Sequence, residues 1–95
     1  MKDDNKQELL KISWELHSQV ETAYLNNEAK QDDDDWLEKQ RFLLADMALH
    51  LLQTSLKPGD LKLERLRDNL HAILTISDQF LPKAALKKAT KKLYL

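Results

Sequence analysis

The chain has 95 residues, a mass of 11.1 kDa and a net charge of −1, and this size allows one domain with one hydrophobic core. One glycine, two prolines and no cysteine exclude disulfide scaffolds and zinc fingers and disfavour β-hairpins. No apolar segment approaches the roughly 20 residues that a membrane span requires, and the opening MKDDNKQELL lacks the apolar centre of a signal peptide. We therefore predict one all-α domain, residues 1–95, in a cytoplasmic, reducing setting.

The first predicted helix covers about residues 4–26. Apolar side chains recur along it at three-to-four spacing, which places them on one face of a helix. A second apolar arc widens this face, so the helix is expected to contact two neighbours, or one neighbour and a partner protein. The face consists of Leu9, Ile12, Leu16, Val20, Ala23 and Tyr24, and the second arc of Leu10, Trp14 and Leu25.

A polar connector, residues 27–35, follows and ends in the four aspartates Asp32–Asp35. Carboxylates at the start of a helix accept hydrogen bonds from free backbone N–H groups and interact favourably with the helix dipole. A calcium loop of the EF-hand type needs a glycine at its sixth position and a glutamate at its twelfth, and the connector has neither. The aspartates are therefore interpreted as helix-start residues.

The second predicted helix, about residues 34–55, contains the most apolar stretch of the chain, LLADMALHLL at 43–52. Its polar residues Asp46 and His50, with Gln53 just beyond, fall along one narrow stripe. A helix that is apolar on nearly every other side is expected to be surrounded by partners. This helix is therefore predicted to be the central one, with Trp36, Leu43, Met47 and Leu51 on its principal face.

Two more helices complete the predicted fold. The third, about residues 61–80, follows a proline-glycine turn and is the most regular amphipathic helix. The fourth, about residues 82–93, is short and basic and begins at Pro82, a residue suited to the first turn of a helix. Short connections favour up-down packing. We predict a single small antiparallel helical bundle of three long helices and a short basic C-terminal helix. The inner face of the third helix is predicted to contain Leu63, Leu66, Leu70, Ile73, Leu74, Ser77, Phe80 and Leu81.

Charge is distributed unevenly along the sequence. Residues 1–60 carry 7 basic and 13 acidic side chains, whereas residues 82–95 carry 5 lysines and no acid. The lysines fit nucleic acid or peripheral membrane contact, but an acidic body repels polyanions at long range and disfavours both. The preferred interpretation is a helix that packs its apolar stripe on the bundle and leaves its lysines in water. Binding to a protein partner is the next alternative.

Each of the first three helices carries one histidine near a carboxylate. The pairs are His17 with Glu21, Asp46 with His50, and Asp68 with His71. The spacing of His17 and Glu21 resembles the carboxylate and imidazole ligand sets of hemerythrin-like bundles. On a helical wheel, however, His50 lies in a polar stripe and His71 lies on the solvent-facing side of its helix, whereas His17 points into an apolar arc. We therefore expect the three imidazoles to face apart and to form no metal site.

No motif specifies a reaction or a cofactor. The serines and threonines lack a glycine-rich elbow, and Gly59 stands alone, so neither nucleophilic catalysis nor a phosphate loop is indicated. We expect a non-catalytic protein that acts through protein-protein interaction as an adaptor, regulator or inhibitor, with a homodimer as one way to cover its extra apolar arcs. The candidate partner-binding residues are Leu10, Trp14, Phe42, Leu49, Lys87, Lys88, Lys91 and Lys92.

Two other hypotheses stay open at this point. Chain length and helix number are similar to those of bacteriocin immunity proteins, and this fold-level resemblance implies a protective, inhibitor-type function. The second alternative is a metal-binding helical bundle, with enzymatic activity, that uses His17 and Glu21.

Overall fold

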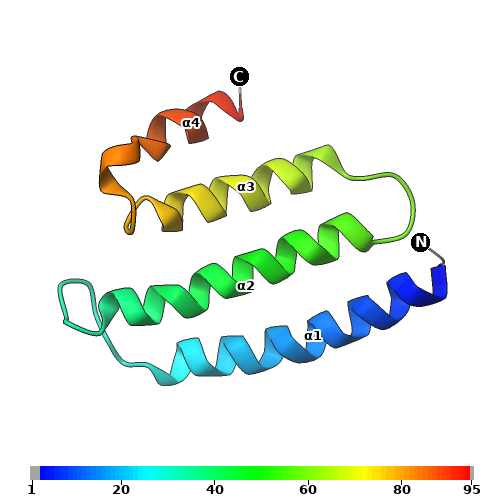
Figure 1. Cartoon of the computed structure of the whole chain (residues 1–95), viewed down its shortest axis with the longest axis horizontal. Coiled ribbons are helices and arrows are strands. Elements are labelled where there is room, and N and C mark those ends of the chain that lie inside the picture. The colour runs from blue at the N-terminus through cyan, green and yellow to red at the C-terminus, as the bar shows by residue number, and fades with distance from the viewer. Residues whose placement is uncertain (1–2, 95) are drawn as a thin grey trace.

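The computed structural model describes residues 3–94 as an all-α chain (Figure 1). Its elements are α1 (Asp3–Asn26), α2 (Trp36–Leu56), α3 (Leu63–Ser77), the short 3-10 helix η1 (Pro82–Ala84) and α4 (Leu86–Lys92). Residues 3–94 contain no strand. The predicted all-α fold, with three long antiparallel helices and a short basic helix at the C-terminal end, is confirmed.

The helices lie side by side in a single layer (Figure 1). α2 packs between α1 and α3, and α4 packs on the other side of α3. The molecule measures 45 × 36 × 15 Å, and the shortest dimension is little more than the diameter of one helix with its side chains, about 10–12 Å. The bundle is therefore open. Each helix packs through its flanks, and no second layer of described helices covers either broad face.

Local chemistry explains where the helices begin and end. α2 begins at Trp36, two residues later than predicted, and its N-cap Asp35 makes no side-chain capping hydrogen bond. Asp33 instead stabilises the connector, because its Oδ2 accepts a hydrogen bond of 2.7 Å from the backbone N–H of Lys30. The interpretation of the aspartates as helix caps is thus wrong for Asp35. Near the other end of the chain, Ala85 adopts a left-handed conformation with φ 53°, which divides the predicted fourth helix into η1 and α4.

The seams between the helices are thin and partly polar. Among the described side chains, Ile76 is the only buried apolar one, with 6 % of its surface exposed. Between α2 and α3, Gln40 is 3 % exposed, and its Oε1 accepts a hydrogen bond of 3.0 Å from Gln79 Nε2. Buried polar groups need such partners, so these contacts fix how the helices meet. The other buried residues are Ser13, Asp46, Gln53 and Thr90.

The expectation that α2 would be surrounded is right for its flanks and wrong for its broad faces. Leu37 and Leu52 remain 45 % and 38 % exposed, because α1 and α3 cover only the two sides of the helix. The inner face predicted for α3 is likewise incompletely covered, and Leu63 at its start is 69 % exposed.

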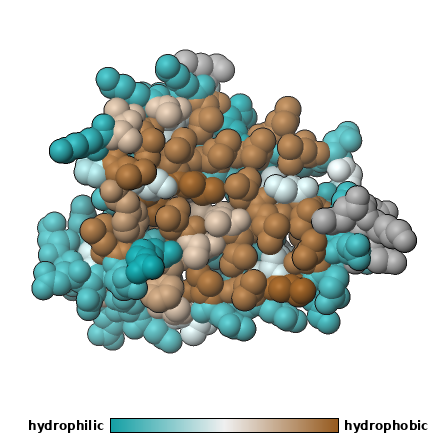
Figure 2. Space-filling view, in the orientation of Figure 1, coloured by the Kyte–Doolittle hydropathy of each residue, from teal (hydrophilic) through white to brown (hydrophobic). Residues whose placement is uncertain are grey.

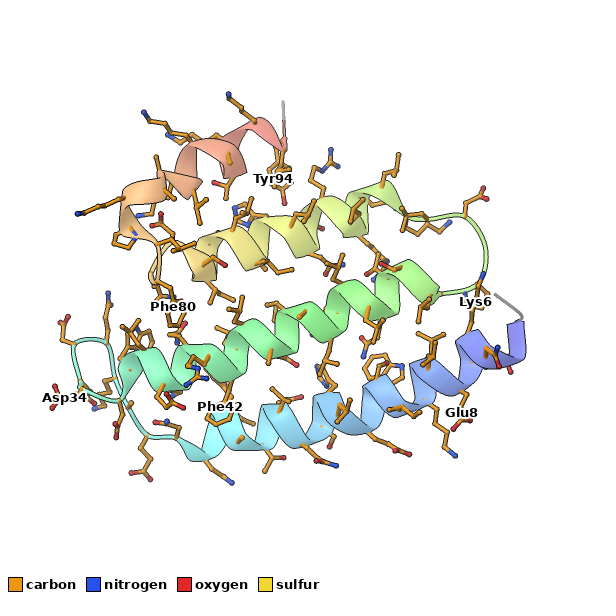
Figure 3. All side chains as sticks on the ribbon, in the orientation of Figure 1. Lys6, Glu8, Asp34, Phe42, Phe80 and Tyr94 are labelled. Atoms are coloured by element: carbon orange, nitrogen blue, oxygen red, sulfur yellow. The ribbon has the colours of Figure 1, made fainter. Side chains whose placement is uncertain are left out.

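α4 is docked on α3 by an aromatic contact. Figure 3 shows Tyr94 between the two helices, and its hydroxyl donates a hydrogen bond of 2.7 Å to Asp68 Oδ1. The ring meets the edge of His71 at 5.5 Å and lies 5.1 Å from the guanidinium of Arg67. The hydrogen bond to Asp68 raises the pKa of the Tyr94 phenol above its ordinary value, because it favours the protonated form.

Candidate functional site

One broad face of the layer is apolar. Figure 2 shows apolar side chains running across it from α1 to α4. The exposed residues that belong to this face are identified by their angular positions around each helix. At about 100° per residue, these positions are counted from the side of the helix that contacts its neighbour. On α1, for example, Leu16 lies about 100° and Ile12 about 140° around the helix from His17, which points toward α2. The large exposed residues that this geometry assigns to the apolar face are Leu9, Ile12, Leu16, Leu52 and Leu63.

The accessible surface is large for a chain of this size. It amounts to 7173 Å², about 1,500 Å² more than the roughly 5,700 Å² expected of a compact monomer of this mass. The Cα radius of gyration is 15.0 Å, whereas a compact domain of this length has about 12 Å. Both differences follow from the single layer, which leaves uncovered the apolar face that a closed bundle buries.

The structure distributes the predicted partner-binding residues over three places. Leu10 and Trp14 line a groove of about 570 Å³ between α1, α2 and α3. Trp14 lies about 200° around α1 from Ile12, so this groove opens on the opposite side from the apolar face. Phe42 and Leu49 are half-buried, and Figure 3 shows Phe42 extending from α2 toward α1. The four lysines, Lys87, Lys88, Lys91 and Lys92, are exposed on α4 at the edge of the layer.

A polar cluster occupies the seam between α1 and α2. His17 Nε2 lies 2.9 Å from Asp46 Oδ1 and 3.2 Å from His50 Nε2, and His50 Nε2 lies 3.6 Å from Asp46 Oδ2. The side chains of His17 and Asp46 are only 14 % and 13 % exposed, whereas that of His50 is 37 % exposed. These three residues place one potential metal-ligand atom each within 4.8 Å of the others.

The prediction that the imidazoles face apart is wrong for His17 and His50. A helical wheel gives the direction of a side chain relative to its own helix, but it does not show which sides of two helices meet. The polar stripe of α2 faces α1, and His17 faces α2, so the two patterns converge. His71 is remote from this pair, as expected, and packs on Tyr94. The missed signal was the stripe itself, because a polar stripe in an apolar helix requires a polar partner on its neighbour.

Comparison with protein families, with curated proteins and with solved structures gives no significant match. No helix within residues 3–94 has both the length and the apolarity needed to cross a membrane.

Proposed function

We propose that this chain is a non-catalytic protein that works by association. Its apolar face pairs with a second copy, and the dimer acts on a macromolecular partner as an adaptor, regulator or inhibitor. The uncovered apolar face supports this proposal, because large exposed apolar patches on a protein mark interaction surfaces. The cytoplasmic setting expected from the sequence belongs to the same proposal.

The surface area supports a stable interface. The excess accessible surface of about 1,500 Å² estimated from the size of the chain exceeds the roughly 800 Å² per partner of a standard interface. Interfaces that bury clearly more than this standard area are found in obligate dimers, and they are more hydrophobic than transient interfaces. A second layer of helices would give the exposed leucines the cover that the monomer does not provide.

Charge and symmetry favour a second copy as the occupant of this face. α1 contains two lysines and five acidic residues, whereas residues 82–92 contain five lysines and no acid. A twofold dimer uses the same surface patch on both copies. If the axis is parallel to the helices, α1 of each copy lies over α4 of the other, and acidic residues meet basic ones. An axis across the helices would place α1 on α1, where like charges repel.

Sedimentation equilibrium over a range of protein concentrations tests this proposal. We expect the mass to approach twice 11.1 kDa as concentration rises, and the affinity to fall with added salt because exposed charges are screened. Changing Lys87, Lys88, Lys91 and Lys92 to glutamate should weaken the dimer, and adding Glu8→Lys and Glu15→Lys should restore it. A monomer at every concentration would exclude the second copy as the occupant of this face. A dimer insensitive to the lysine variant would exclude the α1 over α4 arrangement.

The bacteriocin-immunity alternative implies a protective protein that binds a toxin. No feature of residues 3–94 favours it over the broader proposal, because its basis is chain length and helix number alone.

A further inference from the structure

We propose that His17, Asp46 and His50 form a binding site for a first-row divalent metal ion, with Zn²⁺ as the best fit. The site lies in the seam between α1 and α2 and is reached from the groove, on the opposite side of the layer from the apolar face. It does not depend on the proposed dimer. The ligand set also differs from the His17 and Glu21 pair expected from the sequence.

The spacing of the ligand atoms fits a tetrahedral ion. Zn²⁺ binds imidazole nitrogen and carboxylate oxygen at about 2.0–2.2 Å, which places neighbouring ligand atoms about 3.3 Å apart in a tetrahedron. The separations in the cluster are 2.9 Å from His17 Nε2 to Asp46 Oδ1, 3.2 Å between the two Nε2 atoms, and 3.6 Å from His50 Nε2 to Asp46 Oδ2. The two distances to Asp46 end on different carboxylate oxygens, so one ion would contact both imidazoles and either or both of these oxygens after small side-chain rotations.

Hydrogen bonds alone leave this cluster incomplete. Asp46 Oδ1 is buried and has no hydrogen-bond partner in the described part of the chain, although His17 Nε2 is only 2.9 Å away. The two Nε2 atoms face each other at 3.2 Å, so at most one of them can donate to the other. A buried carboxylate oxygen without a donor is costly. A cation placed between the three groups would give this oxygen a partner and would use the lone pairs of both imidazoles.

The surroundings of His17 also suit a metal ligand. Glu21 Oε2 lies 3.6 Å from the other ring nitrogen, Nδ1, on the side from which an outer carboxylate orients a ligating histidine. The Trp14 ring packs edge-on against the imidazole, with the ring centroids 5.6 Å apart, and limits its rotation. Glu21 thus takes the role of an outer-shell partner in this proposal, whereas the sequence suggested it as a ligand.

The ligand types select the class of metal. Two imidazoles with one carboxylate favour Zn²⁺ and neighbouring transition metals, whereas Mg²⁺ and Ca²⁺ prefer all-oxygen sites. Three protein ligands leave a fourth position for water or a small anion. His50 lines the groove, so this fourth position faces solvent. Asp46 and His50 lie on α2 and His17 lies on α1, so a bound ion would join the two helices.

Titration of the metal-free protein with Zn²⁺, followed by calorimetry, tests the site. We expect one ion per chain, no comparable binding of Mg²⁺, and an increase in Tm on saturation, because the ion binds the folded state. Replacement by Co²⁺ should give the intense visible bands of tetrahedral coordination. His17→Ala and His50→Ala should each weaken Zn²⁺ binding at least tenfold, whereas His71→Ala, which removes the histidine outside the cluster, should leave it unchanged.

Two outcomes would overturn the proposal. One is the absence of stoichiometric Zn²⁺ binding to the folded wild-type chain. The other is an equal loss of affinity in the His71→Ala control, since this would identify nonspecific binding by surface histidines. Asp46→Asn keeps the side-chain size and should also weaken binding, and circular dichroism of each variant confirms that it is folded. Sedimentation in the same samples separates metal binding from dimer formation, because either property can be lost without the other.

Discussion

Replacing a leucine on the apolar face by a charged residue should separate the dimer at concentrations where the wild-type chain is associated. Leu16 is 44 % exposed on that face of α1. Full burial of a leucine side chain contributes about 1.5–3 kcal/mol, so covering the exposed part in both copies contributes about 1.3–2.6 kcal/mol. Leu16→Glu removes this contribution and buries a carboxylate. The dissociation constant should therefore rise at least about tenfold, since 1.4 kcal/mol corresponds to a factor of ten.

The same helix provides a matched control. Leu25 is 66 % exposed and lies nine residues from Leu16, which places it about 180° around α1, on the opposite side of the layer. Leu25→Glu should leave the dissociation constant within a factor of two to three, a range of about 0.5 kcal/mol. Sedimentation equilibrium on both variants provides the comparison. If the two substitutions weaken association equally, or if neither does, the apolar face is not the dimer interface.

Three further predictions concern the seams and the C-terminal region. Gln79→Ala should lower the free energy of unfolding by about 1–3 kcal/mol in urea denaturation, because it leaves the buried amide of Gln40 without its partner. Ala85→Gly should raise it by about 0.5–1 kcal/mol, since Ala85 has φ 53° and glycine adopts left-handed conformations without strain. Asp68→Asn should lower the raised pKa of Tyr94 toward its ordinary value of about 10, as measured by tyrosinate absorbance. In the wild-type chain, the hydrogen bond from Tyr94 to Asp68 stabilises the fold fully below the pKa that Tyr94 has in the unfolded chain. This stabilisation is lost as pH rises through the higher pKa that Tyr94 has in the folded chain.

Simple controls accompany these variants. Gln19→Ala, at an exposed position on α1, should change the unfolding free energy by less than about 0.5 kcal/mol. Ala89→Gly, inside α4, should destabilise rather than stabilise, and a stabilising effect there would undermine the explanation given for Ala85. A Tyr24→Phe background makes Tyr94 the only tyrosine in the titration. An unchanged titration after Asp68→Asn would refute the assignment of Asp68 as the cause of the raised pKa.

The sequence predicted the helices well because their signals are local. Three-to-four spacing of apolar residues marked α1 and α3, and the turn around Pro58 and Gly59 separated α2 from α3. The ends were less predictable. Nothing in the residue types indicates that Ala85 adopts a left-handed conformation, because alanine normally favours the right-handed helix. Whether the helices close into a bundle or stay in one layer depends on contacts between distant segments, and apolar spacing along each helix fits both arrangements.

The histidine cluster shows the same limit at the level of the site. The sequence pattern indicated all three residues as members of carboxylate–histidine pairs. It also correctly placed Asp46 and His50 on one polar stripe of α2. The separation of His17 Nε2 and His50 Nε2, 3.2 Å, depends on how α1 and α2 are turned toward each other. Those rotations are set by the polar seam, in which Ser13 is also fully buried. A polar residue in the middle of an otherwise apolar helix face is thus the sequence feature that could have indicated the pairing.

The thinness of the molecule links its folding to its concentration. A chain only 15 Å deep has almost no interior of its own, so in the proposed dimer much of the water-excluding environment of each protomer would come from its companion. Unfolding of such a protein releases two chains, and its midpoint temperature should climb as more protein is added and fall on dilution. Abundance in the cell would then govern both how often the protein is paired and how long it survives proteolysis.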